Sequence, residues 1–119
     1  MAKKKMKYHR ELLKGSTDHL LLTLIGQEPM YGYRLIKEIG KRSDGYFQFK
    51  ESTLYPALHR LENEGFVKGK WERLPNGQDR RYYYLTESGR RVLNAKRDEW
   101  LGFSAAVNLV IEPVKMGGG

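Results

Sequence analysis

The segment spanning residues 52–65 constrains the fold of this chain more than any other. Three leucines recur with the spacing of one face of an α-helix, namely Leu54, Leu58 and Leu61. Proline has no N–H to donate, so Pro56 is expected in the first turn of the helix, where backbone donors have no partner. Gly65 is suited to the left-handed conformation that ends helices. The segment therefore predicts a helix that begins at Ser52 or Thr53 and stops at Gly65.

Two shorter helices are predicted ahead of this segment. The first begins at Ser16 or Thr17, residue types that cap helices. Its apolar side chains follow at helical spacing: Leu20, Leu21, Leu24 and Ile25. The second helix runs over about residues 31–42, and a connector with the turn signal Asp44-Gly45 leads from it to the third.

After Gly65 the apolar pattern changes from a helical period to a period of two. Residues 66–73 and 80–85 are rich in Val, Trp and Tyr, which favours β-strands. Asn76-Gly77 lies between them and supplies the positive φ angles that tight hairpin turns need. The sequence thus predicts a β-hairpin after the third helix.

A long helix is predicted after the hairpin. Thr86 is suited to cap it, and the helical pattern runs from Glu87 to Ile111. Its apolar residues include two sets spaced by seven positions: Leu93, Trp100 and Val107, and Phe103 with Val110. Lys96 interrupts the second set, so we expect a short coiled-coil-like seam between two copies of the chain.

The predicted elements follow the order helix, helix, turn, helix, β-hairpin and helix. We therefore expect a mainly α fold with a small β-hairpin (α+β), a winged helix-turn-helix with a long C-terminal dimerisation helix. The third helix of such a unit is slim enough to enter a DNA major groove about 12 Å wide. The expected units are a basic flexible tail at 1–10, the winged helix domain at 11–85, the dimerisation helix at 86–111 and a flexible end at 112–119.

The charge of the chain agrees with a polyanionic partner without selecting one. Lys and Arg number 22 against 14 Asp and Glu, a net charge of +8, and proteins that bind nucleic acids or membrane surfaces share such an excess. Residues 20–25 form the longest apolar stretch, far short of the roughly 18 residues of a membrane span. The basic start, Lys3 to Lys7, leads into further polar residues instead of the apolar stretch of a signal peptide. With no cysteine for disulfides, we expect a cytoplasmic protein without a membrane partner.

Candidate DNA contacts come from two places. On the third helix, outward side chains are suited to phosphates or base edges: Ser52, Thr53, Tyr55, His59 and Arg60. In the hairpin, cations and polar tip residues are suited to phosphates and the minor groove: Lys68, Lys70, Asn76, Gln78, Arg80 and Arg81. Two alternatives stay open, because outward residues also form ordinary solvated faces and strand cations also protect sheet edges.

The consecutive tyrosines and the histidines carry weaker signals. Alternation along a strand turns at least one tyrosine inward, and we expect core packing for Tyr82 or Tyr84 rather than stacking on single-stranded nucleic acid. The three histidines, His9, His19 and His59, are scattered, and neither a metal-binding pair nor a nucleophile–base pair occurs. We expect no enzyme activity, no cofactor and no metal.

Five stretches of the chain resemble the PadR-like transcriptional regulators: residues 30–37, 52–62, 64–67, 80–83 and 85–89. The string Leu-Tyr-Pro-x-Leu-x-Arg-Leu-Glu, which begins at Leu54, is the most specific part. The resemblance implies a winged helix that binds duplex DNA, a dimer built through the C-terminal helix and a repressor function. As in many members, it also implies release of DNA when a small aromatic effector binds. Carried over by position, the residues that face DNA are the hairpin residues and Tyr31, Ser52, Thr53, Tyr55 and Arg60.

Trp100 lies in the middle of the expected seam. If two copies pair about a twofold axis, their Trp100 rings frame a slot for a flat aromatic effector, and simple filling of the dimer core is the alternative. The function expected from the sequence is that of a homodimeric regulator bound to a palindromic operator in double-stranded DNA. A winged helix used for contact with protein or RNA is the alternative.

Overall fold

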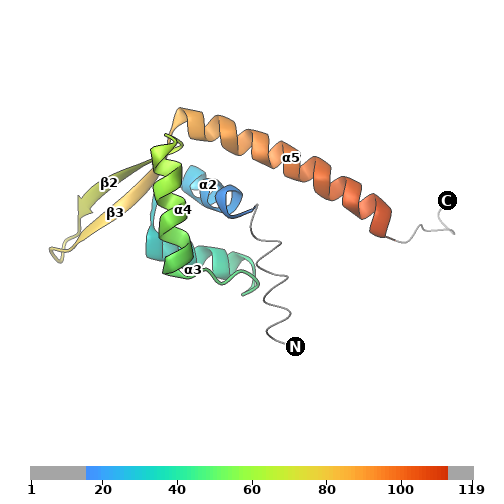
Figure 1. Cartoon of the computed structure of the whole chain (residues 1–119). Helices are drawn as coiled ribbons and strands as arrows, with labels where there is room; N and C mark the ends of the chain where they lie inside the picture. Colours follow the sequence, from blue (N-terminus) through green and yellow to red (C-terminus); the bar gives the residue numbers. More distant parts are fainter. Residues whose placement is uncertain (1–15, 113–119) are drawn as a thin grey trace.

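The computed structural model describes residues 16–112, which form four α-helices and one three-stranded antiparallel sheet. The helices are α2 (Thr17–Gln27), α3 (Gly32–Arg42), α4 (Glu51–Asn63) and α5 (Glu87–Ile111), and the strands are β1 (Met30–Tyr31), β2 (Val67–Arg73) and β3 (Asp79–Leu85). Helices α2–α4 pack against one another and against the sheet, and we call this unit the body. The far end of the β2–β3 hairpin extends from one side of the body, and α5 leads away on the other (Figure 1). The predicted α+β winged helix is confirmed. The expected tail at 1–10 and the expected end, apart from Glu112, lie outside the described residues.

Helix α4 begins one residue before the predicted start. The N–H groups of Thr53 and Leu54 both donate to the carbonyl of Lys50, each at 3.0 Å. We expected Pro56 in the first turn, but because of this earlier start it is the sixth residue of the helix. The carbonyl of Ser52 thereby loses the N–H it would otherwise accept. Ser52 is exposed, so water is available to that carbonyl and the proline is tolerated.

Gly65 ends α4 as predicted. Its φ of +81° lies in the left-handed region, and its N–H donates to the carbonyl of Glu62 at 3.0 Å. The N–H of Phe66 donates to the carbonyl of Leu61 at 2.9 Å. These two bonds reverse the chain and lead it directly into β2.

The predicted hairpin is present, but its turn is closed differently. The N–H of Gly77 donates to the carbonyl of Leu74 at 2.9 Å, and the N–H of Leu74 donates to the carbonyl of Gln78 at 2.7 Å. Gly77 has a φ of +89°, whereas Asn76 takes no positive φ. The side chain of Asn76 instead accepts the N–H of Gln78 at 3.0 Å. A single left-handed residue therefore closes the turn, where the Asn-Gly pattern predicts two.

Strand β1 was not predicted. It pairs with β3, with Met30 opposite Tyr83 and Tyr31 opposite Tyr82, so the strand order is β1-β3-β2. Two residues are too few for an alternating pattern to be visible in the sequence. The pairing fixes Tyr31 and the start of α3 beside the hairpin.

The core of the body lies between α2, α3, α4 and the inner face of the sheet. The leucines predicted to be buried on α4, Leu54, Leu58 and Leu61, are at most 1% exposed. Of the three consecutive tyrosines, Tyr83 is the buried one, whereas Tyr82 and Tyr84 are only half-buried. The prediction of alternation was right but its choice of tyrosine was wrong. The register opposite Met30 and Gly69, which turns Tyr83 toward the core, is set by tertiary pairing.

Helix α5 joins the body through its first two turns. Thr86 caps it as predicted, its hydroxyl oxygen accepting the N–H of Gly89 at 3.0 Å. Gly89 is buried, and a side chain there would collide with the carbonyl of Phe66. One turn further, Leu93 lies so close to Gly26 of α2 that a Cβ on that glycine would be 3.1 Å from it. No helix within residues 16–112 is long and apolar enough to cross a membrane.

Candidate nucleic-acid interface

Helix α4 presents polar side chains on the side away from its buried leucines. Ser52, Thr53 and His59 are exposed there. The two hydroxyls lie in the first turn, where no side chain caps the first backbone N–H groups of the helix. Hydroxyl, imidazole and free amide groups of this kind bind phosphate oxygens and base edges.

Tyr55 lies between α4 and the start of α3. A Cβ on Gly32 would be 2.7 Å from the Cε1 atom of the Tyr55 ring, so the ring occupies the space that this glycine leaves empty. Burial, assisted by the charge of Glu51, raises the pKa of Tyr55, and its hydroxyl therefore keeps its proton. The geometry makes Tyr55 a rigid wedge with one hydrogen-bond donor at its tip.

Arg60 is engaged by carboxylates. Its guanidinium donates to Asp18 of α2 at 2.5 and 2.9 Å and to Glu64 at 3.3 Å. The hydrogen bond to Asp18 is the largest of the effects that raise the pKa of Arg60. The side chain is half-exposed, but in this arrangement it ties α4 to α2. Its predicted role as a DNA contact remains a prediction, to which this arrangement gives no support.

The hairpin divides its cations between two faces. One face carries Lys68, Lys70 and Arg80. The two lysines and Glu72 alternate along β2 and so point the same way, and Arg80 lies directly opposite Glu72. On that face the ammonium of Lys70 lies 5.1 Å from the centre of the Tyr84 ring. A hydrogen bond to Glu72 raises the pKa of the Tyr84 hydroxyl. Arg81 lies on the opposite face, toward α4, where it pairs with Glu62.

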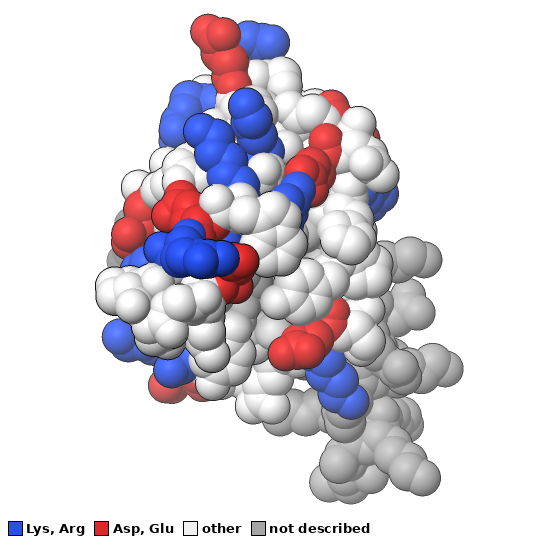
Figure 2. All heavy atoms as spheres, turned by 90° about the vertical axis from the view of Figure 1, so that its left-hand side faces the viewer, with Lys and Arg blue, Asp and Glu red and all other residues white. Residues whose placement is uncertain are grey.

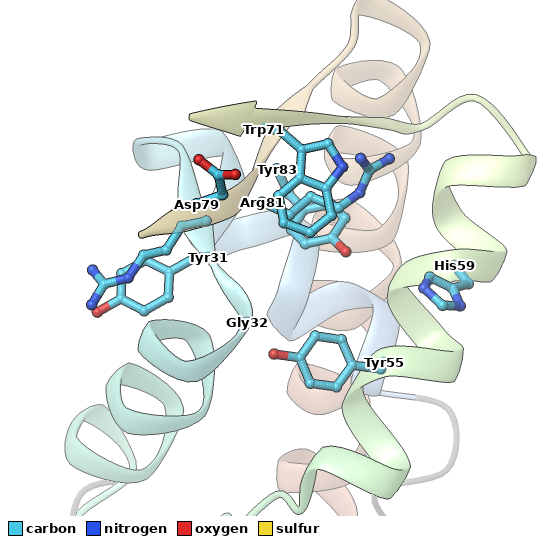
Figure 3. A pocket seen from close by; sticks show the side chains of 9 residues that line it. Tyr31, Gly32, Tyr55, His59, Trp71, Asp79, Arg81 and Tyr83 are labelled. Atoms are coloured by element: carbon cyan, nitrogen blue, oxygen red, sulfur yellow. The ribbon is translucent and has the colours of Figure 1, made fainter. Parts of the chain in front are cut away.

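An open hollow of about 370 Å³ separates α4 from the hairpin. Tyr55 and His59 border it from α4, Tyr31 from β1 and Trp71 from the hairpin (Figure 3). Arg80 reaches its rim, with its guanidinium carbon 4.1 Å from the centre of the Tyr31 ring. The hollow thus combines aromatic rings with groups that donate hydrogen bonds.

The tip of the hairpin is polar and exposed. Asn76 and Gln78 lie there, and their side chains bond to each other at 3.4 Å. Seen from the side of the hairpin, Lys and Arg side chains are interspersed with carboxylates (Figure 2). Charge alone therefore marks no continuous basic stripe on this face (Figure 2).

Two residues at this site were missed by sequence reasoning, Trp71 and Glu62. Trp71 is 66% exposed and borders the hollow. Glu62 lies on the side of α4 that faces the hairpin, where it accepts from Arg81. Strand alternation could have separated Trp71 from the outer cations, but no pattern in the sequence shows that Glu62 and Arg81 meet across nineteen positions.

The predicted dimer and effector residues are distributed unevenly along α5. Leu93 is half-buried against the core of the body, so it packs within its own chain. Trp100, Phe103 and Val110 are 49%, 62% and 84% exposed, and Val107 is half-buried. The large apolar residues exposed nearby that the prediction did not include are Leu101, Leu109 and Ile111. Residues 16–112 contain no cluster of three or more side chains that could hold a metal ion.

Helices α2, α3 and α4 pack together, and α4 has a polar outer face. The hairpin of β2 and β3, residues 67–85, lies beside α4 as a two-stranded wing. This arrangement defines a winged helix-turn-helix protein (Figure 1). The sequence profile of the Transcriptional regulator PadR-like family matches residues 21–95. The chain belongs to this family, and it is therefore a DNA-binding transcriptional regulator and not an enzyme.

Known relatives agree with this assignment. The chain is 30% identical over 88 residues to a transcriptional regulator from Mycobacterium tuberculosis, a match that covers 74% of this chain and 78% of that protein. It is similar to a PadR family transcriptional regulator from Eggerthella lenta, with a TM-score of 0.79, 28% identity and 95% and 96% of the two chains covered. A PadR-like transcriptional regulator from Bacillus cereus has a TM-score of 0.79 and 30% identity, with 87% of this chain and 99% of that chain covered.

Proposed function

We propose that the chain represses transcription by binding a palindromic operator in double-stranded DNA. Helix α4 enters the major groove, and the wing contacts the backbone and minor groove beside it. The observation that carries this proposal is the hollow, which has the polar face of α4 on one side and the wing on the other. The proposed DNA contacts are Tyr31, Ser52, Thr53, Tyr55, His59, Lys68, Lys70, Asn76, Gln78 and Arg80.

Arg60 and Arg81 have a different proposed role. Each donates to carboxylates of its own chain, Arg60 to Asp18 and Arg81 to Glu62. A guanidinium that is already paired has fewer donors left for phosphate, and breaking the pair to reach DNA would leave the carboxylate close to a polyanion. We therefore propose that both arginines fix the position of α4.

The unit that binds the operator is proposed to be a homodimer joined through α5. Trp100, Phe103 and Val110 repeat along the distal part of this helix and are about half or more exposed in the single chain. Burying such residues against a second copy removes apolar surface from water, and a twofold axis brings each residue near its counterpart. Two winged domains on one axis match a palindrome with half-sites one helical turn apart, about 34 Å.

The dimer seam is also the proposed effector site. The rings of Trp100 and Phe103 lie 6.1 Å apart between centres and are tilted by 36°. With the same two rings from the second copy, they would line a slot for a small planar aromatic molecule. Such a ligand releases DNA if it favours a dimer in which the two α4 helices no longer match the half-site spacing. Because a transcriptional regulator acts where its DNA lies, the proposed location of the protein is the cytoplasm.

Selection of bound sites from random DNA duplexes tests the main proposal, together with binding measured against salt. We expect a twofold palindrome, and about six phosphate contacts per complex should give a log–log salt slope near −5. A flat salt response on duplex DNA would overturn the proposal. Equal binding to every RNA would instead support the alternative of an RNA-contact module.

A further inference from the structure

Glu62 connects α4 to the wing. Its Oε2 atom accepts a hydrogen bond from Nη2 of Arg81 at 2.5 Å and from the N–H of Gly69 at 3.3 Å. Among the ion pairs of residues 16–112, this pair alone joins α4 to the sheet. One carboxylate on α4 therefore holds a side chain of β3 and a backbone group of β2.

The Arg81 side chain is enclosed on several sides. Its guanidinium carbon lies 5.6 Å from the centre of the Trp71 ring and 5.9 Å from that of Tyr83. Gly69 makes room for it, because a Cβ at that position would be 2.5 Å from the guanidinium nitrogens. Both ends of the ion pair are less than a third exposed, so solvent screens it less than the pairs at the surface. Arg81 is thus a fixed support next to Trp71.

Trp71 is 66% exposed although a fixed cation lies beside its ring. It extends from the hairpin over the hollow, across from Tyr55 and His59 on α4 (Figure 3). A DNA strand that runs from the groove occupied by α4 to the wing has to pass this hollow. The ring is placed where the strand exposes deoxyribose, whose apolar edge packs on aromatic faces, while donors at the rim are available to the adjoining phosphate.

We propose that Glu62 and Arg81 hold Trp71 in the position where its ring packs against one deoxyribose of the bound strand, next to the adjoining phosphate. This inference rests on the proposed DNA binding and adds a contact that the sequence did not indicate. Trp71 touches the DNA. Glu62 and Arg81 are positioning residues that act through it and through the angle between α4 and the wing.

The sign of a charge change distinguishes positioning from simple electrostatics. Glu62 is a negative charge close to a polyanion, so Glu62→Gln should tighten DNA binding if charge were all that mattered. If Glu62 positions the wing, the same substitution weakens binding to every sequence, by about fivefold for the loss of one charged hydrogen-bonded pair. Glu72→Gln is the matched control. It removes an equal charge from the other face of the wing, where Glu72 bonds Tyr84, and it should leave binding unchanged or slightly tighter.

Affinity is measured by the fluorescence anisotropy of a labelled operator duplex, which does not depend on tryptophan. Circular dichroism melting of each variant shows whether the body is still folded. Binding by Glu62→Gln as tight as wild type, in folded protein, would overturn the positioning role. A wild-type protein that gives no anisotropy change at all would show that DNA binding itself has failed.

The position of Trp71 is read separately, because the chain has only two tryptophans. In a Trp100→Phe background all tryptophan emission comes from Trp71, and its quenching by acrylamide reports its exposure. We expect the duplex to protect Trp71 strongly in this background and only weakly when Glu62→Gln is added, at saturating DNA in both cases. Equal quenching of Trp71 with and without bound duplex would show that it does not touch the strand and would overturn the inference.

Discussion

The face formed by α4 and the wing differs from the distal half of α5 in whether its side chains have partners within the chain. On the first face, charged groups are held by partners within the chain, as in the pairs of Arg60 with Asp18 and Arg81 with Glu62. Along α5 beyond Leu93, large apolar side chains stand in solvent. Six of the nine exposed large apolar residues of the described chain belong to this stretch: Trp100, Leu101, Phe103, Leu109, Val110 and Ile111.

The difference agrees with the two kinds of partner proposed above. A surface that binds a polyanion needs polar groups fixed in position, and internal ion pairs supply that rigidity without covering the remaining donors. A surface that binds a second protein chain resembles one half of a hydrophobic core. The free energy of association comes from removing its apolar area from water. The body already has a buried core of its own. It should therefore fold without the distal half of α5, whose apolar side chains the second copy covers in the proposed dimer.

The largest effect is expected from the same truncation at two positions. Leu58→Ala removes a side chain with no exposure in the core of the body, and it should lower the free energy of unfolding by about 2–5 kcal/mol. Leu109→Ala makes the same change on α5, at 83% exposure, and should leave the unfolding of the body nearly unchanged. Urea denaturation at a low, fixed protein concentration measures both. Similar losses for the two variants would show that body and α5 are not separate in stability.

Trp100→Ala is expected to act on association and not on the body. Loss of a central tryptophan costs about 2 kcal/mol for each copy in a dimer interface, or roughly a 30-fold weaker association per copy. Sedimentation equilibrium measures the association, and circular dichroism checks that the helices remain. Asn94→Ala, an exposed change earlier on the same helix, is the control. If Trp100→Ala associates as tightly as wild type, the apolar stripe of α5 is not the dimer seam.

The outer cations of the wing should affect DNA binding in a way that α5 does not. Lys70→Ala and Arg80→Ala should each reduce the log–log salt slope by about one unit, because each removes one phosphate contact. Arg97→Ala deletes a cation from the exposed side of α5 and should leave the slope as it is. Salt titrations of labelled duplex binding give the three slopes. An equal reduction by Arg97→Ala would mean that the chain responds to total charge and not to the wing.

The smallest effect is expected where α5 lies against α2 of the body. Burial lowers the pKa of His19, and the charge of Lys96 on α5 lowers it further. Because the folded-state pKa lies below the unfolded value of 6.5, the unfolded chain takes up the proton first, and stability falls as the pH drops below about 7 until the folded-state pKa is passed. His19→Gln should flatten this part of the curve of urea midpoint against pH. Parallel curves for the two proteins would exclude His19 as the titrating group.

Local patterns predicted most of the fold. The leucine stripe of α4, Gly65 as its end and Thr86 as the cap of α5 were all correct, because each depends on residues within a few positions of one another. The errors have a different origin. The start of α4, the turn at Asn76 and the choice of Tyr83 as the buried tyrosine depended on competing hydrogen bonds or on strand register.

For the interface, the sequence identified which residue types would lie on α4 and on the wing, and its resemblance to PadR-like regulators indicated the family. It could not show which cations form ion pairs with carboxylates, because no sequence pattern distinguishes Arg60 and Arg81 from Lys70 and Arg80 in this respect. Arg60 meets Asp18 across α4 and α2, and Arg81 meets Glu62 across β3 and α4, elements that come together only through packing.

By itself, then, the sequence determined the order of the elements, the polar and apolar faces of each helix and the class of protein, because periodicity, caps and turn residues act locally along the chain. Only the tertiary structure decided which arginines pair with carboxylates of other elements, that β1 adds an edge strand to the sheet, and that Trp71 borders the hollow between α4 and the wing. The physical reason is that these features depend on contacts between distant segments. Their distances are fixed by the packing of the core and not by spacing in the chain.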